Sequence, residues 1–80
     1  MYTLFYRLTC PYCRTVLGTS NDLGIELDLR DIAEEPNRMA LIERGGKQQV
    51  PFLVDEKKGV AMYESNDIVA YLKSNGTISA

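Results

Sequence analysis

Two cysteines separated by a proline and a tyrosine, Cys10-Pro11-Tyr12-Cys13, are the residues of this chain best suited to chemistry. Pro11 fits the first position of a helix, so the two thiols are expected one helical turn apart at a helix N-terminus. Unpaired backbone N–H groups and the helix dipole favour a thiolate there. We therefore predict that Cys10 is the exposed nucleophile, with the positive charge of Arg7 three residues before it.

Cys13 lies one turn further into the same predicted helix. It is expected to face inward and to keep a higher pKa, which suits a resolving thiol that attacks only after a mixed disulfide has formed. The alternatives are a zinc half-site and a pair of inert core cysteines. Because the chain has two cysteines and no histidine to complete a ligand set, no metal site is expected.

Length and composition indicate one folded domain covering residues 1–80, with 45% hydrophobic and 25% charged residues. Nine basic and eleven acidic residues are interspersed and give a net charge of −2, so nucleic-acid binding is not expected. The sequence contains no apolar run near the roughly 20 residues that span a bilayer and no signal peptide. We therefore expect a monomeric cytoplasmic protein without membrane contact.

The hydrophobic pattern predicts four strands and three helices in the order βαβαββα. In chain order they are strand 2–6, helix 11–23, strand 25–30, helix 36–45, strands 50–54 and 60–63, and helix 65–75. Glycines end the helices, at Gly24, at Gly45-Gly46 and at Asn75-Gly76. A strand-helix-strand unit followed by a hairpin and a helix predicts an α/β fold with a four-stranded mixed sheet flanked by helices.

The sequence also predicts three local features: the apolar side of the second helix, the position of Pro51 and the start of the last helix. Met39 and Ile42, with Leu41 as a further candidate, should form the apolar side of the second helix. Pro51 should occupy an edge or irregular position, since proline cannot donate to a strand ladder. Ser65 should be the N-cap of the last helix.

The cysteine pair after a first strand and Val50-Pro51 before the third resemble the glutaredoxin family over nearly the whole chain. The resemblance implies a thioredoxin fold in which Pro51 is cis, lies beside the active cysteine and leaves the Val50 backbone free to pair with glutathione. It also implies further contacts to glutathione from the residues Arg7, Tyr12 and Gln48 or Gln49, with Lys47 as a weaker candidate.

A second resemblance lies in residues 63–68, Tyr-Glu-Ser-Asn-Asp-Ile, which look more like the N-terminal domain of glutathione S-transferases. It implies that Glu64-Ser65 holds the γ-glutamyl group, with Ser65 at its carboxylate and Glu64 or Asp67 at its ammonium. The alternative is a plain helix cap with solvated carboxylates. Such transferases continue into a helical domain, and between a single-domain relative and an excised domain we expect the former.

The resemblance implies a glutathione-dependent thiol–disulfide oxidoreductase. The Cys10 thiolate would attack a protein or glutathione mixed disulfide, and Cys13 or a second glutathione would release the product. Glutathione is the expected co-substrate, and proteins with disulfides or bound glutathione are the expected partners. The alternative hypotheses are a thioredoxin-type reductase, a glutathione-conjugating transferase and a non-catalytic glutathione-binding module.

Overall fold

The structure, a computed structural model, describes residues 2–75. Its elements are β1 (Tyr2–Tyr6), α1 (Pro11–Leu23), β2 (Leu27–Asp31), α2 (Glu35–Gly45), β3 (Phe52–Asp55), β4 (Val60–Met62) and α3 (Ser65–Asn75). The predicted βαβαββα order is confirmed. Gly76, the second residue of the predicted last stop, lies outside the described residues.

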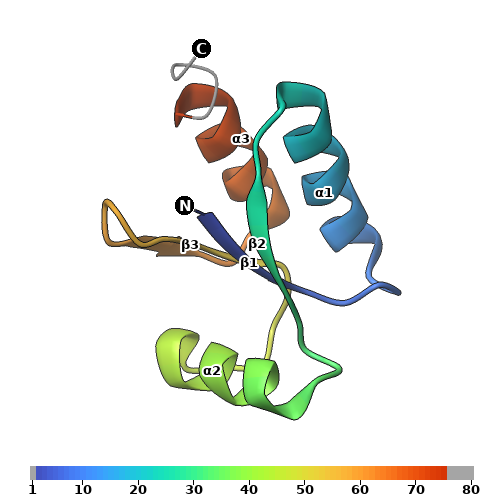
Figure 1. The fold of residues 1–80 in the computed structure, drawn as a ribbon, viewed down its shortest axis with the longest axis vertical. Coiled ribbons are helices and arrows are strands. Elements are labelled where there is room, and N and C mark those ends of the chain that lie inside the picture. The colour runs from blue at the N-terminus through green and yellow to red at the C-terminus, as the bar shows by residue number, and fades with distance from the viewer. Residues whose placement is uncertain (1, 76–80) are drawn as a thin grey trace.

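The four strands form one mixed sheet in the order β2-β1-β3-β4. β1 pairs in parallel with β2 and antiparallel with β3, and Leu4 lies opposite both Leu29 and Leu53. Helices α1 and α3 lie side by side on one face of the sheet, and α2 covers the other face alone (Figure 1).

Alternate residues of β1 supply two separate apolar cores, one on each face of the sheet, because side chains alternate along a strand. Leu4 is buried toward α1 and α3, whereas Phe5 is buried toward α2. The first core contains Leu4, Val16, Leu53, Ile68 and Leu72. The second contains Phe5, Ile32, Leu41, Phe52 and Val54. The central strand is thereby fixed between the two layers.

Helix α1 has the predicted ends. Pro11 occupies its first turn, and Gly24 ends it with a φ of 69°, a left-handed conformation that glycine adopts without strain. Val16 and Ser20, four residues apart, are buried, and Val16 packs in the core with Leu4 of the sheet and Ile68 of α3. This packing anchors the helix that carries the cysteine pair at its N-terminus.

The boundaries of β2, β3 and β4 differ from the prediction by one or two residues, and β4 ends at Met62 rather than at residue 63. β2 begins at Leu27 rather than at residue 25, and Leu29 is 47% exposed because β2 is an edge strand. β3 begins only at Phe52, so Val50 and Pro51 precede it and the Val50-Pro51 peptide bond is cis. The predicted irregular position of Pro51 is confirmed.

The predicted apolar side of α2 is wrong for Met39 and Ile42, whereas the further candidate Leu41 is confirmed. Met39 and Ile42 are 60% and 42% exposed, and Leu41 is fully buried. Asn37, Leu41 and Gly45, spaced by four residues, face the sheet, and Asn37 donates from Nδ2 to the Asp31 carbonyl at 3.0 Å. Anchoring to the end of β2 thus selects a face of α2 that has few apolar residues.

A buried polar contact joins the end of β3 to α3. The Tyr71 hydroxyl donates to the Asp55 carboxylate at 2.6 Å, and Asp55 is only 4% exposed. This hydrogen bond holds the pKa of Asp55 below its usual range. It also raises the pKa of Tyr71 to about 12, together with burial of the phenol. The contact ties α3 to the hairpin.

Candidate functional site

Cys10 is the N-cap residue of α1. Its backbone is extended, with φ −86° and ψ 117°, and its Sγ accepts the Cys13 backbone N–H at 3.4 Å. The thiol thus occupies the position where serine, threonine or aspartate usually caps a helix. The sulfur thus satisfies one of the backbone donors that a helix N-terminus leaves unpaired. The predicted placement of Cys10 is confirmed.

Cys13 differs from Cys10 in the way that the sequence predicts. It is fully buried beneath the first turn of α1, and both sulfurs are free thiols. Burial, with smaller contributions from Cys10, raises the pKa of Cys13 to about 12, although the backbone N–H of Arg7 acts against the shift. At neutral pH Cys13 is therefore protonated while Cys10 is half-exposed.

Arg7 lies in the loop between β1 and α1, and its carbonyl accepts the Cys10 N–H at 3.2 Å. Its backbone and its positive charge act on Cys13. Its side chain is exposed and does not line the groove described next. The structure thus places Arg7 beside the cysteines rather than among the other predicted glutathione contacts.

A groove of about 440 Å³ opens beside the first turn of α1. This volume lies in the range of small-molecule sites, about 300–1,000 Å³. Eight residues line it: Tyr12, Gln49, Val50, Pro51, Tyr63, Glu64, Ser65 and Asn66. The groove therefore brings together six predicted contacts from three separate parts of the chain: Tyr12, Gln49, Val50, Pro51, Glu64 and Ser65. The other candidates do not line it, namely Arg7, Lys47, Gln48 and Asp67, and neither do Cys10 and Cys13.

The groove has two walls. The first wall is residues 49–51, which lead into β3, and Val50 lies outside the strand pairing. The second wall is residues 63–66, at the junction of β4 and α3. Tyr12, 64% exposed, adds the side nearest the cysteines, since it belongs to the helical turn that Cys10 caps.

Ser65 is the first residue of α3, not its predicted N-cap. The carbonyl of Glu64 accepts the Ile68 N–H at 2.8 Å, so Glu64 holds the cap position. Within residues 2–75 the Ser65 hydroxyl has no hydrogen-bond partner. The hydroxyl and the first N–H groups of α3 are thus left for a ligand in the groove.

Two lining residues, Tyr63 and Asn66, were not predicted. Tyr63 was placed in the strand 60–63 and at the start of the transferase-like segment 63–68, without a contact to glutathione. In the structure β4 ends at Met62 and the Tyr63 ring turns toward α2. No signal in the sequence distinguishes a tyrosine that closes a strand from one that borders a groove. For Asn66 the signal was its position directly after the Glu64-Ser65 pair.

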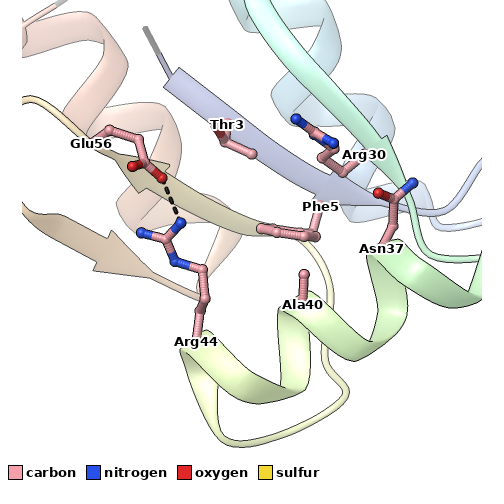
Figure 2. A pocket seen from close by; sticks show the side chains of 7 residues that line it. All are labelled: Thr3, Phe5, Arg30, Asn37, Ala40, Arg44 and Glu56. Atoms are coloured by element: carbon pink, nitrogen blue, oxygen red, sulfur yellow. Dashed lines mark hydrogen bonds and ion pairs between the residues drawn. The ribbon is translucent and has the colours of Figure 1, made fainter.

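A second, smaller hollow of about 220 Å³ lies on the α2 side of the sheet (Figure 2). Thr3, Phe5 and Ala40 line its interior, and Arg44 pairs across its edge with Glu56 at 2.6 Å. It shares no residue with the groove.

No helix among residues 2–75 could cross a membrane, and no metal-binding cluster of three acidic, cysteine or histidine side chains occurs within that range.

The sequence profile described as glutathione S-transferase, N-terminal domain, matches residues 4–76 of this chain. The chain belongs to this family. A search of curated proteins found no match. The four-stranded sheet with three helices is the thioredoxin-like fold of this transferase domain, which confirms the predicted fold class. The prediction of a glutaredoxin of the Cys-Pro-Tyr-Cys type is not confirmed. The alternative hypothesis of a transferase-like protein agrees better with this family match.

Solved transferases share this fold. Glutathione S-transferase 1-6 from Anopheles dirus species B is 31% identical, with a TM-score of 0.74 over 90% of this chain and 34% of that protein. A delta-class glutathione transferase from Nilaparvata lugens is 25% identical, with a TM-score of 0.78 over 94% and 36%. A glutathione S-transferase from Methylobacillus flagellatus, solved with glutathione bound, is 25% identical, with a TM-score of 0.77 over 94% and 37%. This transferase-family chain thus spans about a third of their length.

Proposed function

We propose that the groove binds glutathione and that the Cys10 thiol carries out thiol–disulfide exchange with disulfides that contain glutathione. The main support is one observation: the groove, which is bordered by Val50 and Pro51 on one side and by Glu64 and Ser65 on the other, begins at the helical turn that Cys10 caps. Membership of a glutathione transferase family, and a relative solved with glutathione bound, support the choice of ligand.

The cysteine and γ-glutamyl parts of glutathione each have suitable partners in the groove. The unpaired Val50 backbone can form strand-like hydrogen bonds with the central cysteine of the tripeptide. The γ-glutamyl carboxylate suits the N-terminus of α3, where Ser65 and Asn66 present backbone donors. The ammonium beside it suits the exposed Glu64 carboxylate. This arrangement directs the glutathione sulfur toward the α1 side.

The proposed reaction is a pair of thiol–disulfide exchanges. The Cys10 thiolate attacks the glutathione sulfur of a glutathionylated protein, forming a Cys10–glutathione disulfide and releasing the protein thiolate. The thiolate of a second glutathione then attacks that sulfur, giving glutathione disulfide and restoring the Cys10 thiolate. Overall, the sulfur of the second glutathione is oxidised to the disulfide level as the protein sulfur of the mixed disulfide is reduced to a thiol. We propose the cytoplasm as the setting because thiols are kept reduced there.

The second glutathione, rather than Cys13, is proposed to complete the cycle. Cys13 has a pKa of about 12 and no exposure to solvent, so little of its thiolate exists at neutral pH. Thiol–disulfide exchange requires the thiolate. Cys13→Ser should therefore retain most of the activity toward glutathione mixed disulfides.

A second candidate is conjugation, in which the bound glutathione thiolate attacks an electrophilic carbon. The family match favours it directly. In that reaction Cys10 would not form a covalent bond, so its replacement by serine should leave activity.

The test is turnover of a glutathionylated peptide with glutathione, glutathione reductase and NADPH, set beside turnover of an electrophilic aromatic compound. We expect peptide turnover that Cys10→Ser abolishes and Cys13→Ser largely retains. Conjugation that survives Cys10→Ser, without peptide turnover in the wild type, would replace the first proposal by the second. Absence of both activities and of glutathione binding would reject both.

A further inference from the structure

We infer that Tyr63 is a positioning residue that fixes the separation of the two groove walls, and that residue 45 is glycine to make room for its ring. The effect on glutathione binding rests on the proposed function. The coupling of the walls is a property of the protein alone, so the two can be tested separately.

Tyr63 connects the walls directly. It is the first residue of the wall 63–66, and its hydroxyl donates to the backbone carbonyl of Lys47 at 3.0 Å. Lys47 lies two residues before the wall 49–51. The Lys47 ammonium also returns over the Tyr63 ring, 4.8 Å from its centroid. One side chain therefore links two segments that are 16 residues apart.

The Tyr63 ring is held in place from two further directions. It packs on the buried Phe52 ring with centroids 4.4 Å apart. Gly45, the last residue of α2, lies at the hydroxyl end of the ring and close to Phe52 as well. A Cβ at residue 45 would overlap the Tyr63 hydroxyl and lie 2.7 Å from its Cζ. The ring thus occupies the space that any larger residue at position 45 would need.

The conformation of the backbone does not explain the glycine at residue 45. Gly46 supplies the left-handed turn that ends α2, with a φ of 85° and an N–H bond to the Ile42 carbonyl at 2.7 Å. Gly45 is helical and has no positive φ. A helical glycine is less stable than alanine at the same position. Close approach of Tyr63 accounts for its presence.

The binding test uses S-methylglutathione, whose blocked sulfur cannot react with Cys10. Calorimetric titration of the wild type is compared with Tyr63→Phe, which removes only the hydroxyl, and with Gly45→Ala, which displaces the ring. We expect the dissociation constant to rise about 2- to 10-fold for Tyr63→Phe, as for loss of one neutral hydrogen bond, and more for Gly45→Ala. The matched controls Tyr2→Phe and Gly18→Ala should bind as the wild type, since Tyr2 is outside the groove and a Cβ at residue 18 meets nothing within 4 Å.

Hydrogen exchange without ligand decides the inference even if the proposed function fails. In Tyr63→Phe and Gly45→Ala, the hydrogen-bonded amides beside the two walls, Gly46 and Ile68, should exchange faster than in the wild type, with β1 and α1 unchanged. If the two residues are coupled sterically, adding Gly45→Ala to Tyr63→Leu should change the exchange rates little further, because leucine leaves empty the space that the Tyr63 ring occupies beside residue 45. Unchanged exchange beside both walls, a uniform increase throughout the domain, or additive effects of the two substitutions would overturn the inference. If the wild type does not bind S-methylglutathione while both walls loosen, only the glutathione proposal fails.

Discussion

Replacing Tyr71 by phenylalanine removes one hydroxyl from the buried contact between α3 and the end of β3. The ring remains, so its edge-to-face packing on Tyr2, with centroids 6.3 Å apart, is retained. The Asp55 carboxylate, 4% exposed, loses its 2.6 Å hydrogen bond and keeps the longer bond from the Lys58 N–H at 3.4 Å. The substitution therefore removes the hydrogen bond of this hydroxyl to a buried charge.

The expected loss of unfolding free energy follows from that charge. A hydrogen bond to a charged group contributes about 1.5–3 kcal/mol. For a domain of this size each kcal/mol corresponds to about 4–8 °C, so the melting temperature should fall by about 6–24 °C. The control Tyr6→Phe removes a hydroxyl that has no hydrogen bond within residues 2–75, and we expect a change within about 0.5 kcal/mol.

The difference between wild type and Tyr71→Phe should depend on pH in a defined direction. Because the pKa of Asp55 is lowered by folding, its contribution is present above about pH 4, the usual unfolded value, and is lost as the pH falls through the folded pKa. Because the pKa of Tyr71 is raised to about 12, its contribution is present below about pH 10 and is lost toward pH 12. The difference should be constant near neutrality and shrink at both extremes.

Urea unfolding of wild type, Tyr71→Phe and Tyr6→Phe between pH 3 and pH 9 measures these differences. Thermal unfolding extends the comparison to alkaline pH. A loss below about 0.5 kcal/mol at pH 7, or a difference that stays the same at pH 3, would refute the reasoning, since either result means that the buried carboxylate does not depend on this hydroxyl.

Three further predictions concern the cysteines, α2 and the second hollow. Iodoacetamide at pH 8 should label Cys10 well before Cys13, which has a pKa of about 12, and equal labelling in peptide mass spectra would contradict this. Leu41→Ala should lower the unfolding free energy by about 2–5 kcal/mol, and Met39→Ala should lower it by about 0.5 kcal/mol or less. Urea unfolding measures both losses, and a larger loss for Met39→Ala would favour the face of α2 that the sequence predicts. Arg44→Gln breaks an exposed ion pair (Figure 2) and should cost about 0–1 kcal/mol, less in high salt; a salt-independent loss above this range would contradict a surface pair.

Local signals were sufficient to predict the element order and the ends of α1. Pro11 and Gly24 mark those ends by backbone chemistry that acts within a few residues. The position of Cys10 followed from the same local reasoning. The burial of Cys13 followed from the helical period. These features do not depend on what the rest of the chain packs against.

Features that depend on packing between distant segments could not be predicted. Met39 and Ile42 suggested a buried face of α2, but the contact with the end of β2 turned Leu41 inward. The role of Tyr63 depends on Gly45, 18 residues earlier in the chain, and no local pattern relates the two. The groove residues themselves were found through resemblance to glutathione-binding families, not through periodicity.

The most direct test of the central claim is to trap the proposed intermediate on Cys13→Ser. The variant is incubated with a glutathionylated peptide, quenched with acid and analysed by intact and peptide mass spectrometry. We predict one added glutathionyl group on Cys10 and its loss when reduced glutathione is supplied. Absence of an adduct would contradict the assignment of the Cys10 sulfur as the atom that accepts the glutathionyl group. An equal amount of adduct at another residue of a Cys10→Ser protein would also contradict it.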